Sequence, residues 1–321
     1  MHRETSIWIG GRVSQRRKLI IGSRGSRLAL QQAAMVKDLI QNQNPELEIE
    51  IKIIKTQGDI ILDTPLGKIG DKGLFTKELE NALLHRKIDL AVHSMKDLPI
   101  EIPTGLEIAA ILQREDPHDA FVSHKYNNLH ELPKHATVAT SSLRRRAQVL
   151  AFRSDLQTVD IRGNVDTRLR KMISLNYDGM LLAVAGLKRL QLDSEIKEII
   201  AEEVILPAVG QGALGIEVRQ DDRYTLKQVQ PLNHQPTAQA VAAERALLQA
   251  LGGGCQVPLG ALARVEKNRL NLKAIICDLE GTVVVRGQKS GKSNIAEQIG
   301  FELAHQLIAN GASKILESIH G

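Results

Sequence analysis

Along the chain, the spacing of hydrophobic residues alternates between a strand pattern and a helix pattern. Short apolar runs of strand type are each followed by a longer segment in which apolar residues recur at helical spacing. From Leu19 onward this alternation is typical of an α/β protein with largely parallel sheets. In the first part of the chain we expect strands within 18–26 and over 47–55, 88–94 and 105–112, and helices after Ser26 and over 75–85.

A second unit of the same type begins near Asp119. Ser141 or Ser142 can cap its first helix and Asn164 its second, because their side-chain oxygens accept hydrogen bonds from N–H groups at a helix start. We expect strands at 136–140, 157–161 and 178–186, helices at 143–152 and 165–175, and a connection at 206–219 that runs into a further strand.

The last region differs in character. A helix at 237–251 precedes three strand-like runs that suggest an antiparallel sheet, at 261–266, 270–278 and 282–287. Asn294 and Glu297 form a capping-box pattern that predicts a final helix, ending near Asn310 and Gly311. The predicted fold class is therefore α/β, with two α/β domains followed by a small α+β domain.

Composition excludes some classes of function. The 321 residues are 43% hydrophobic and 25% charged, which is ordinary for a soluble globular protein. Aromatic residues make up only 2% and the net charge is a mild +5, which argues against nucleic-acid binding. No apolar run has the length of a membrane span. Residues 1–17 are basic without a long apolar core, so we expect a disordered extension on a cytoplasmic protein, with organellar targeting left open.

The chain has two cysteines with different surroundings. Cys277 lies in an apolar strand-like run and is interpreted as an inert core thiol. Cys255 lies in LGGGCQVPLG (251–260), where three glycines allow backbone conformations closed to other residues. It is either another buried thiol or one presented to a partner group elsewhere in the molecule. No CxxC or Cys/His cluster indicates a metal site.

Several arginines lie where a predicted strand is followed by a predicted helix. The positions are Arg24, Arg144, Arg145, Arg162 and Arg168. Helix starts favour anions, and guanidinium groups bind carboxylate or phosphate in a bidentate manner. No phosphate-loop or dinucleotide fingerprint is present, so a molecule with several carboxylates fits as well as a nucleotide.

The run DLAVHSMKDLP (89–99) places polar groups at the end of a predicted strand, where ligands of α/β proteins bind. His93 is interpreted as a structural histidine. Asp97, beside Lys96 and facing a basic cleft, is a candidate for an ionised carboxylate that stabilises a developing cation or transfers a proton.

Several motifs, in this order, resemble the porphobilinogen deaminase (hydroxymethylbilane synthase) family. They are IGSRGSRLAL, GDIILDTPLGKIGDKGLFTKELE, VHSMKDLP, TSSLRRRAQ, RGNVDTRL, AVAGLKRL, LPAVGQGALGIE and GGGCQVPLG. The similarity runs from about residue 18 to the C-terminus and leaves 1–17 outside.

The resemblance implies a reaction and a cofactor. The family condenses porphobilinogen, a pyrrole with acetate, propionate and aminomethyl groups, into the linear tetrapyrrole hydroxymethylbilane and releases ammonia at each step. Its fold resembles two-domain periplasmic binding proteins with a third domain added. A dipyrromethane cofactor, made from substrate, is joined by a thioether to the cysteine that corresponds to Cys255. A monomer with no nucleic-acid or membrane partner is expected.

The resemblance also assigns residues and boundaries. Asp97 matches the catalytic aspartate; the expected cofactor contacts are Lys96, Ser142, Arg144, Arg145, Arg162 and Arg168. Around the substrate we expect Arg24, Ser26, Arg162, Arg168 and Arg189, under a mobile loop with Lys68, Lys72 and Phe75. The expected domains are 18–112 with 213–230, then 118–206, then 235–321, with hinges at 113–117 and 207–212.

Two positions depart from the family pattern, and one alternative function stays open. Ile20 and Gln57 stand where a basic residue is common, so we expect slightly weaker substrate binding. The alternative is a non-catalytic anion-binding or effector-sensing protein of the two-domain type. That alternative does not explain the domain with Cys255. A secreted solute-binding protein would also need a signal peptide, and the sequence shows none.

Overall fold

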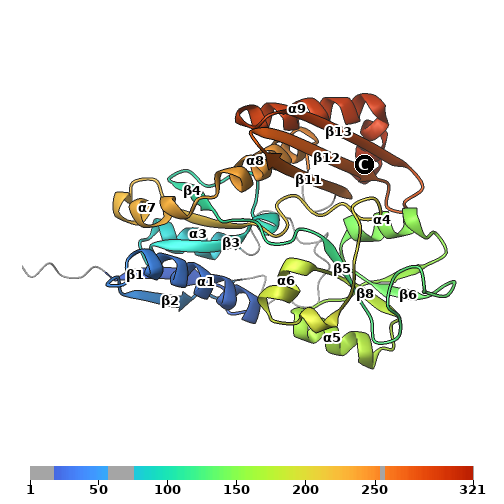
Figure 1. Cartoon of the computed structure of the whole chain (residues 1–321), viewed down its shortest axis with the longest axis horizontal. Helices are drawn as coiled ribbons and strands as arrows, with labels where there is room; N and C mark the ends of the chain where they lie inside the picture. The colour runs from blue at the N-terminus through green and yellow to red at the C-terminus, as the bar shows by residue number, and fades with distance from the viewer. Residues whose placement is uncertain (1–17, 57–75, 254–256, 321) are drawn as a thin grey trace, which may run out of the picture.

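The computed structural model describes residues 18–56, 76–253 and 257–320. These residues form two five-stranded sheets lying end to end, with a third, smaller sheet packed above their junction (Figure 1). Within the described residues, no helix is both long and apolar enough to span a bilayer.

The first sheet is mixed, not wholly parallel. β1 (Leu19–Ser23) runs parallel to β2 (Ile49–Ile53) and β3 (Leu90–Ser94), whereas β10 (Leu214–Arg219) runs antiparallel to β3 and to β4 (Leu106–Ile111). One face packs on α1 (Arg27–Gln43) and α7 (Arg223–Val229), and the other on α3 (Lys77–Leu84).

The second sheet repeats this order. The parallel strands are β6 (Thr137–Ala139), β7 (Gln157–Val159) and β8 (Gly179–Ala183); β5 (Asp119–Val122) lies antiparallel between β8 and β9 (Ile196–Ile199). The covering helices are α4 (Leu143–Phe152), α5 (Val165–Ser174) and α6 (Val184–Arg189).

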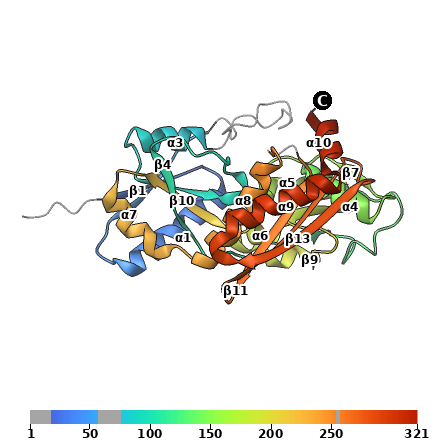
Figure 2. The ribbon, with the colours of Figure 1, turned by 90° about the horizontal axis from the view of Figure 1, so that it is seen from above.

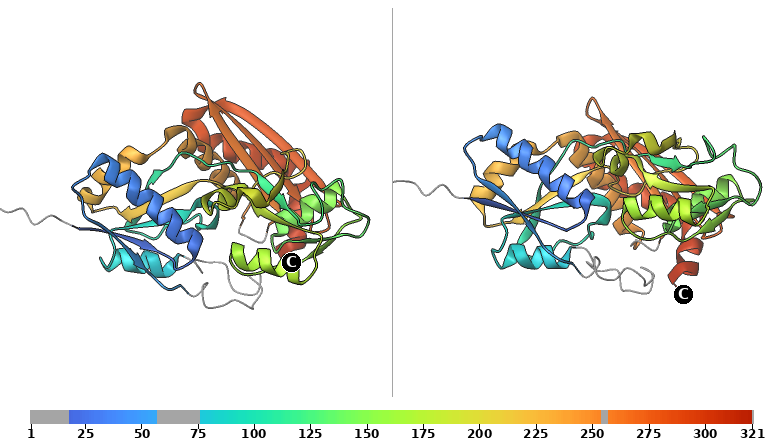
Figure 3. Two further views of the ribbon diagram at one scale, coloured as in Figure 1. Left: turned by 60° about the horizontal axis from the view of Figure 1, so that its bottom comes forward. Right: turned by 90° about the horizontal axis from the view of Figure 1, so that it is seen from below.

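The antiparallel strand of each sheet comes from the chain's crossing between the two halves. After β4 the chain passes through 112–118 into β5, and after β9 it returns through 200–213 into β10. The two halves are therefore joined by two crossing segments, which Figure 3 shows side by side between the sheets.

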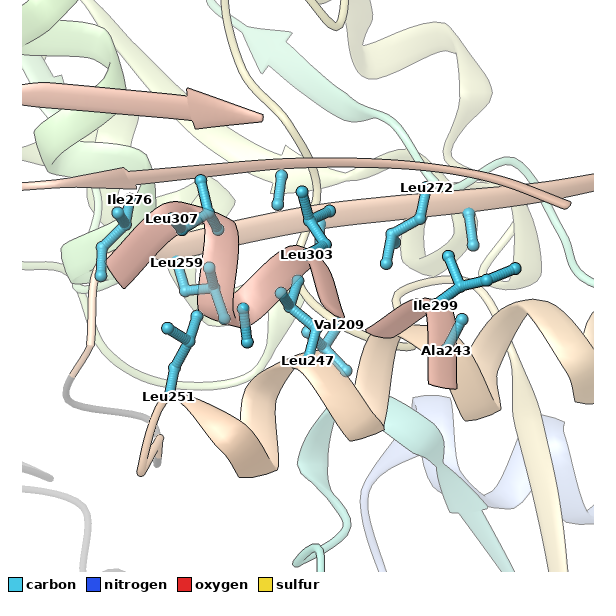
Figure 4. Close-up of a cluster of buried hydrophobic side chains, with 14 of the residues drawn as sticks. Val209, Ala243, Leu247, Leu251, Leu259, Leu272, Ile276, Ile299, Leu303 and Leu307 are labelled. Atoms are coloured by element: carbon cyan, nitrogen blue, oxygen red, sulfur yellow. The ribbon is translucent and has the colours of Figure 1, made fainter. Parts of the chain in front are cut away.

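The C-terminal sheet is antiparallel, as the sequence predicts. It consists of β11 (Leu259–Glu266), β12 (Arg269–Cys277) and β13 (Val284–Lys292). One face is covered by α8 (Gln235–Ala250) and α9 (Ala296–Leu307), whose leucines interdigitate with those of the strands (Figures 2 and 4). The other face packs on α4 and Leu206 of the second half.

Three predictions for individual elements need correction. The run 178–186 is not one strand, because β8 ends at Ala183 and α6 begins at Val184. Asn294 does not cap α9: its N-cap is Ile295, which makes no side-chain cap hydrogen bond. Gly311, at φ 105°, does kink the chain near the predicted end, but a further helix follows as α10 (Ser313–His320).

Candidate active site

β1, β6 and β7 each end at a loop that leads directly into a helix. Ser26 caps α1, Ser142 caps α4 and Asn164 caps α5, in each case by accepting a hydrogen bond from a backbone N–H three residues later. Each cap satisfies one of the free N–H groups of its helix and leaves others directed at the loop. The candidate site is built from these loops and from the turn that follows β3.

Lys96 and Asp97 lie in the turn after β3. Met95 anchors this 3-10 turn, since its side chain is buried and its N–H donates to Ala213 O at 3.0 Å. The Asp97 side chain is exposed, and Lys96 is half-buried. The pKa of Lys96 is lowered, mainly by burial. The carboxylates of Asp97 and Asp119 raise this pKa, whereas the guanidiniums of Arg144 and Arg145 lower it further. The turn therefore faces the start of α4 in the other half of the molecule.

Arg144 and Arg145 are buried and share one carboxylate, Asp119. Arg144 Nη1 lies 2.6 Å from Asp119 Oδ2 and 2.7 Å from Leu206 O. Arg145 donates from Nε and Nη2 to Asp119 Oδ1, at 2.9 and 2.7 Å. Burial opposes ionisation of Asp119, but the two guanidiniums hold its pKa far below the ordinary range. These two arginines thus have a structural partner within the protein as well as a place at the site.

Sequence reasoning missed Asp119. It is the first residue of β5, the strand that enters the second sheet antiparallel, and its side chain is fully buried. The available signal was an acidic residue at the point where the chain crosses between halves, but its pairing with the arginines requires the tertiary fold.

Arg168 is differently placed. Within the described residues its guanidinium makes one hydrogen bond, from Nε to Gly163 O at 2.7 Å. Its pKa is lowered to about 10, first by burial and then by the charges of Arg145 and Arg162, while Asp97 acts in the opposite direction. The charges of Asp97 in the first half and Arg168 in the second therefore interact, and the half-buried Arg162 also acts on Arg168.

Arg24, Ser26 and Arg189 lie where the two halves approach each other. Arg24 is half-buried between β1 and the cap residue Ser26. Arg189 at the end of α6 donates to Gly212 O at 2.6 Å, while its Nε is buried without a hydrogen-bond partner among the described residues. Burial lowers the pKa of Arg189, and the charge of Glu115 acts in the opposite direction. A buried donor without a partner favours an anionic ligand at this point.

Four predicted site residues lie outside the described residues: Cys255, Lys68, Lys72 and Phe75. The structure does place the end of the helix that leads to Cys255. Leu251 packs into the C-terminal core after α8, as Figure 4 shows, and Gly252 follows at φ 65°.

The other two predictions of residue chemistry are confirmed. His93 is buried and its Nε2 lies 2.9 Å from Glu217 Oε2, so it is a structural histidine. Cys277 is buried, and burial raises its pKa to about 12, which keeps the thiol protonated and inert.

Positive charge exceeds negative charge at the site. Among the described residues around the Asp97 turn and the start of α4, the carboxylates of Asp97 and Asp119 lie with the cations Lys96, Arg144, Arg145, Arg162 and Arg168. Such a set suits a ligand that carries several carboxylates. A separate hollow of about 860 Å³ lies at the edge of the C-terminal sheet and includes none of these residues.

Comparison with known families decides the identity. A family sequence model described as "Porphobilinogen deaminase, dipyromethane cofactor binding domain" matches residues 19–227, and one described as "Porphobilinogen deaminase, C-terminal domain" matches 238–309. The chain belongs to the porphobilinogen deaminase family. Its enzyme class is therefore that of a transferase of tetrapyrrole biosynthesis, its cofactor is dipyrromethane, and the non-catalytic alternative is not favoured.

Similar proteins extend over almost the whole chain. The porphobilinogen deaminase of Carboxydothermus hydrogenoformans is 49% identical over 304 residues, covering 95% of this chain and 98% of that protein. The porphobilinogen deaminase of Desulforudis audaxviator is 53% identical with the same coverage. Among solved structures, the methionine-binding protein MetQ is similar at a TM-score of 0.44 and 13% identity, covering 71% of this chain and 93% of that one.

Proposed function

We propose that the strand ends of the two halves form the active site at which this member of the porphobilinogen deaminase family condenses porphobilinogen into hydroxymethylbilane. One observation supports it most: the charge of Asp97 in the first half interacts with that of Arg168 in the second and with that of Lys96. The site thus combines a carboxylate, Asp97, that can stabilise a cationic intermediate with basic residues that can bind the carboxylate groups of that intermediate.

Asp97 is proposed as the catalytic carboxylate. When ammonia leaves the aminomethyl group of the substrate, positive charge spreads onto the pyrrole nitrogen. An exposed, ionised carboxylate beside that N–H stabilises the charge, and stabilises it again when the new carbon–carbon bond forms and before the ring loses its proton. Asp97 suits this task because its side chain is exposed while the turn that carries it is anchored through Met95.

The basic residues are proposed to bind carboxylates. Each pyrrole brings two, so a growing chain adds negative charge at every step. We assign cofactor contacts to Lys96, Ser142, Arg144, Arg145, Arg162 and Arg168, and substrate contacts to Arg24, Ser26, Arg162, Arg168 and Arg189. The surplus of cations and the unpartnered Nε of Arg189 support this assignment. When bound, the dipyrromethane supplies the nucleophilic pyrrole carbon to which the first substrate is added.

The remaining assignments follow the same scheme. We propose that Cys255 holds the cofactor through its thioether, and that Lys68, Lys72 and Phe75 belong to a loop over the site. The proposed domains are 18–112 with 213–230, then 118–206, then 235–321, with hinges at 113–117 and 207–212. We propose a cytoplasmic monomer that binds neither nucleic acid nor membrane.

Replacing Asp97 tests the function directly. We expect Asp97→Ala to retain the covalent cofactor, measured by intact mass, but to lose turnover by at least about 100-fold in an assay of porphobilinogen consumption. The matched control is Glu280→Ala, which removes an exposed carboxylate that pairs with Arg146 at 3.2 Å, outside the site. Normal turnover in Asp97→Ala removes Asp97 from the mechanism.

A further inference from the structure

Arg245 on α8 reaches across to the turn that carries Asp97. Its Nη1 donates to Leu98 O at 3.1 Å, and its Nη2 donates to Pro99 O at 2.6 Å and Ile100 O at 2.9 Å. One guanidinium therefore binds three consecutive carbonyls, and these follow Asp97 directly in the chain. The planar fork of arginine fixes the backbone at several points at once, which a single ammonium group cannot do.

The environment of Arg245 is unusual for a cation. It is half-buried, and burial lowers its pKa, with no carboxylate of the described residues acting against it. The neighbouring residue Glu244, by contrast, is fully buried and forms an ion pair with Arg114. Burying a charge is costly unless it is well hydrogen-bonded, and among the described residues the hydrogen-bond partners of Arg245 are these three backbone carbonyls. The Arg245 guanidinium thus fixes the backbone of residues 98–100.

Packing at the same place reinforces the contact. Leu98 and Met95 are buried in one cluster with Val241, which lies one turn before Arg245 on the same face of α8. Gly210 lies so close to Met95 that an added Cβ would lie 2.8 Å from the Met95 Cβ. The turn of Asp97 is therefore seated on α8 from one side and on the second crossing segment from another.

The same helix leads to the cofactor cysteine. α8 ends at Ala250, and Leu251, Gly252 and Gly253 connect it to the segment that contains Cys255. Through Arg245, α8 therefore contacts the segment that follows Asp97, and the same helix leads into the segment that contains the cofactor cysteine.

We propose that Arg245 is a positioning residue that fixes Asp97 relative to the cofactor-bearing C-terminal domain. The proposal rests on the assignment of Asp97 as the catalytic carboxylate. Arg245 does not touch the reacting atoms; it acts through the backbone of 98–100. It holds the segment after Asp97 against α8, the helix of the C-terminal domain that leads toward Cys255.

The test compares Arg245→Gln and Arg245→Lys with a matched control. Arg153→Gln is the control, because Arg153 also donates to three loop carbonyls, those of Leu129, His130 and Leu132, at the far end of α4. We expect Arg245→Gln to keep the covalent cofactor and a KM within about 3-fold, while kcat falls about 10- to 100-fold, as a misplacement near 1 Å produces. The lysine of Arg245→Lys can still donate to one of the carbonyls, so this variant should have a kcat between those of Arg245→Gln and the wild type. Arg153→Gln leaves kcat unchanged.

A double variant shows whether Arg245 acts through Asp97. If it does, the losses from Arg245→Gln and Asp97→Glu combine to less than their product; if they multiply, the two act independently and the proposal fails. Equal kcat in the wild type, Arg245→Gln and Arg245→Lys also overturns it. Full activity in Asp97→Ala contradicts the proposed function instead, and is seen separately from any effect at Arg245.

Discussion

The arginines of the site are of two kinds, which differ in what they bind within the protein. Arg144 and Arg145 are buried against Asp119, whereas Arg168 makes one hydrogen bond to a backbone carbonyl among the described residues. Removing one partner from a buried ion pair leaves a charge uncompensated and is strongly destabilising. The two kinds should therefore be distinguishable by stability as well as by binding.

We predict that Arg144→Gln lowers the free energy of unfolding by about 3 kcal/mol, and that Arg168→Gln changes it by less than about 1 kcal/mol but raises KM. Urea denaturation measures the first quantity. It is done in a Cys255→Ala background, because a bound cofactor itself stabilises the fold. Equal losses of stability in the two variants would contradict the distinction.

Residue identity alone predicted part of this chemistry. Cys277 was predictable as inert because its surroundings are apolar along the chain itself, and the structure confirms it. The partner of Arg144 and Arg145 was not, because Asp119 lies 25 residues before Arg144 and reaches it only through the antiparallel placement of β5. The contacts of Arg245 to 98–100 were not predictable either, because these residues lie far apart in the sequence and meet only in the folded chain.

At the scale of elements, helix starts were predictable where one side chain decides them. Ser26, Ser142 and Asn164 cap their helices as predicted. Asn294 does not, because β13 continues to Lys292 and the Ser293 N–H donates to Asn268 O, so the N-cap of α9 is Ile295 and the helix begins at Ala296. Sheet pairing overrode the local capping signal.

These two asparagines give a prediction for capping. Asn164 Oδ1 accepts from the Thr167 N–H at 2.9 Å, so Asn164→Ala should destabilise the protein by about 1 kcal/mol. Asn294→Ala, at the position that resembles a cap but is not one, should cost less than about 0.5 kcal/mol. Thermal or urea denaturation of both variants measures the difference. A larger loss for Asn294→Ala would place the cap where the sequence pattern has it.

The boundary between β8 and α6 was not predictable from the pattern. Residues 180–187 are apolar almost without interruption, and an uninterrupted apolar run does not separate a buried strand from a buried helix. In the structure both pieces are buried, Met180, Leu181 and Leu182 in the strand and Val184, Ala185 and Leu187 in the helix.

At the scale of the whole molecule, two carboxylates, the buried Glu244 and the half-buried Glu202, join the C-terminal domain to the crossing segments. Glu244 accepts from Arg114 of the first crossing, the Gly210 N–H of the second and the Ala263 N–H of β11. Glu202, at the second crossing, pairs with Arg264 and Lys273 of the C-terminal sheet. The fold class was predictable from the alternating periods in the sequence, but these ion pairs and the crossing strands were not.

Glu202 should make stability depend on pH. Burial opposes its ionisation, but hydrogen bonds from Arg264 and Lys273 lower its pKa from 4.5 to about 2. A carboxyl with a depressed folded pKa stabilises the fold above its unfolded pKa and loses that contribution as the pH falls through the folded value. The wild type should exceed Glu202→Gln in unfolding free energy by on the order of 2 kcal/mol at pH 7.

That difference should shrink between pH 4.5 and about 2, where Glu202 takes up its proton. Urea denaturation across this range measures it. Glu280→Gln is the control, since Glu280 pairs with Arg146 at the surface, where its side chain is 66% exposed, and should show little difference at any pH. A gap for Glu202→Gln that stays constant down to pH 2 would contradict the assigned ion pairs.

The most direct test of the whole account is the intact mass of the purified protein. The wild type should exceed the mass of its sequence by one dipyrromethane, that is, two pyrrole units. Cys255→Ala should lose both the excess and the turnover of porphobilinogen, while Cys277→Ala, which alters the buried thiol, should keep both. Active protein with an unmodified mass, or an excess that survives in Cys255→Ala, would contradict the covalent primer on which the account depends.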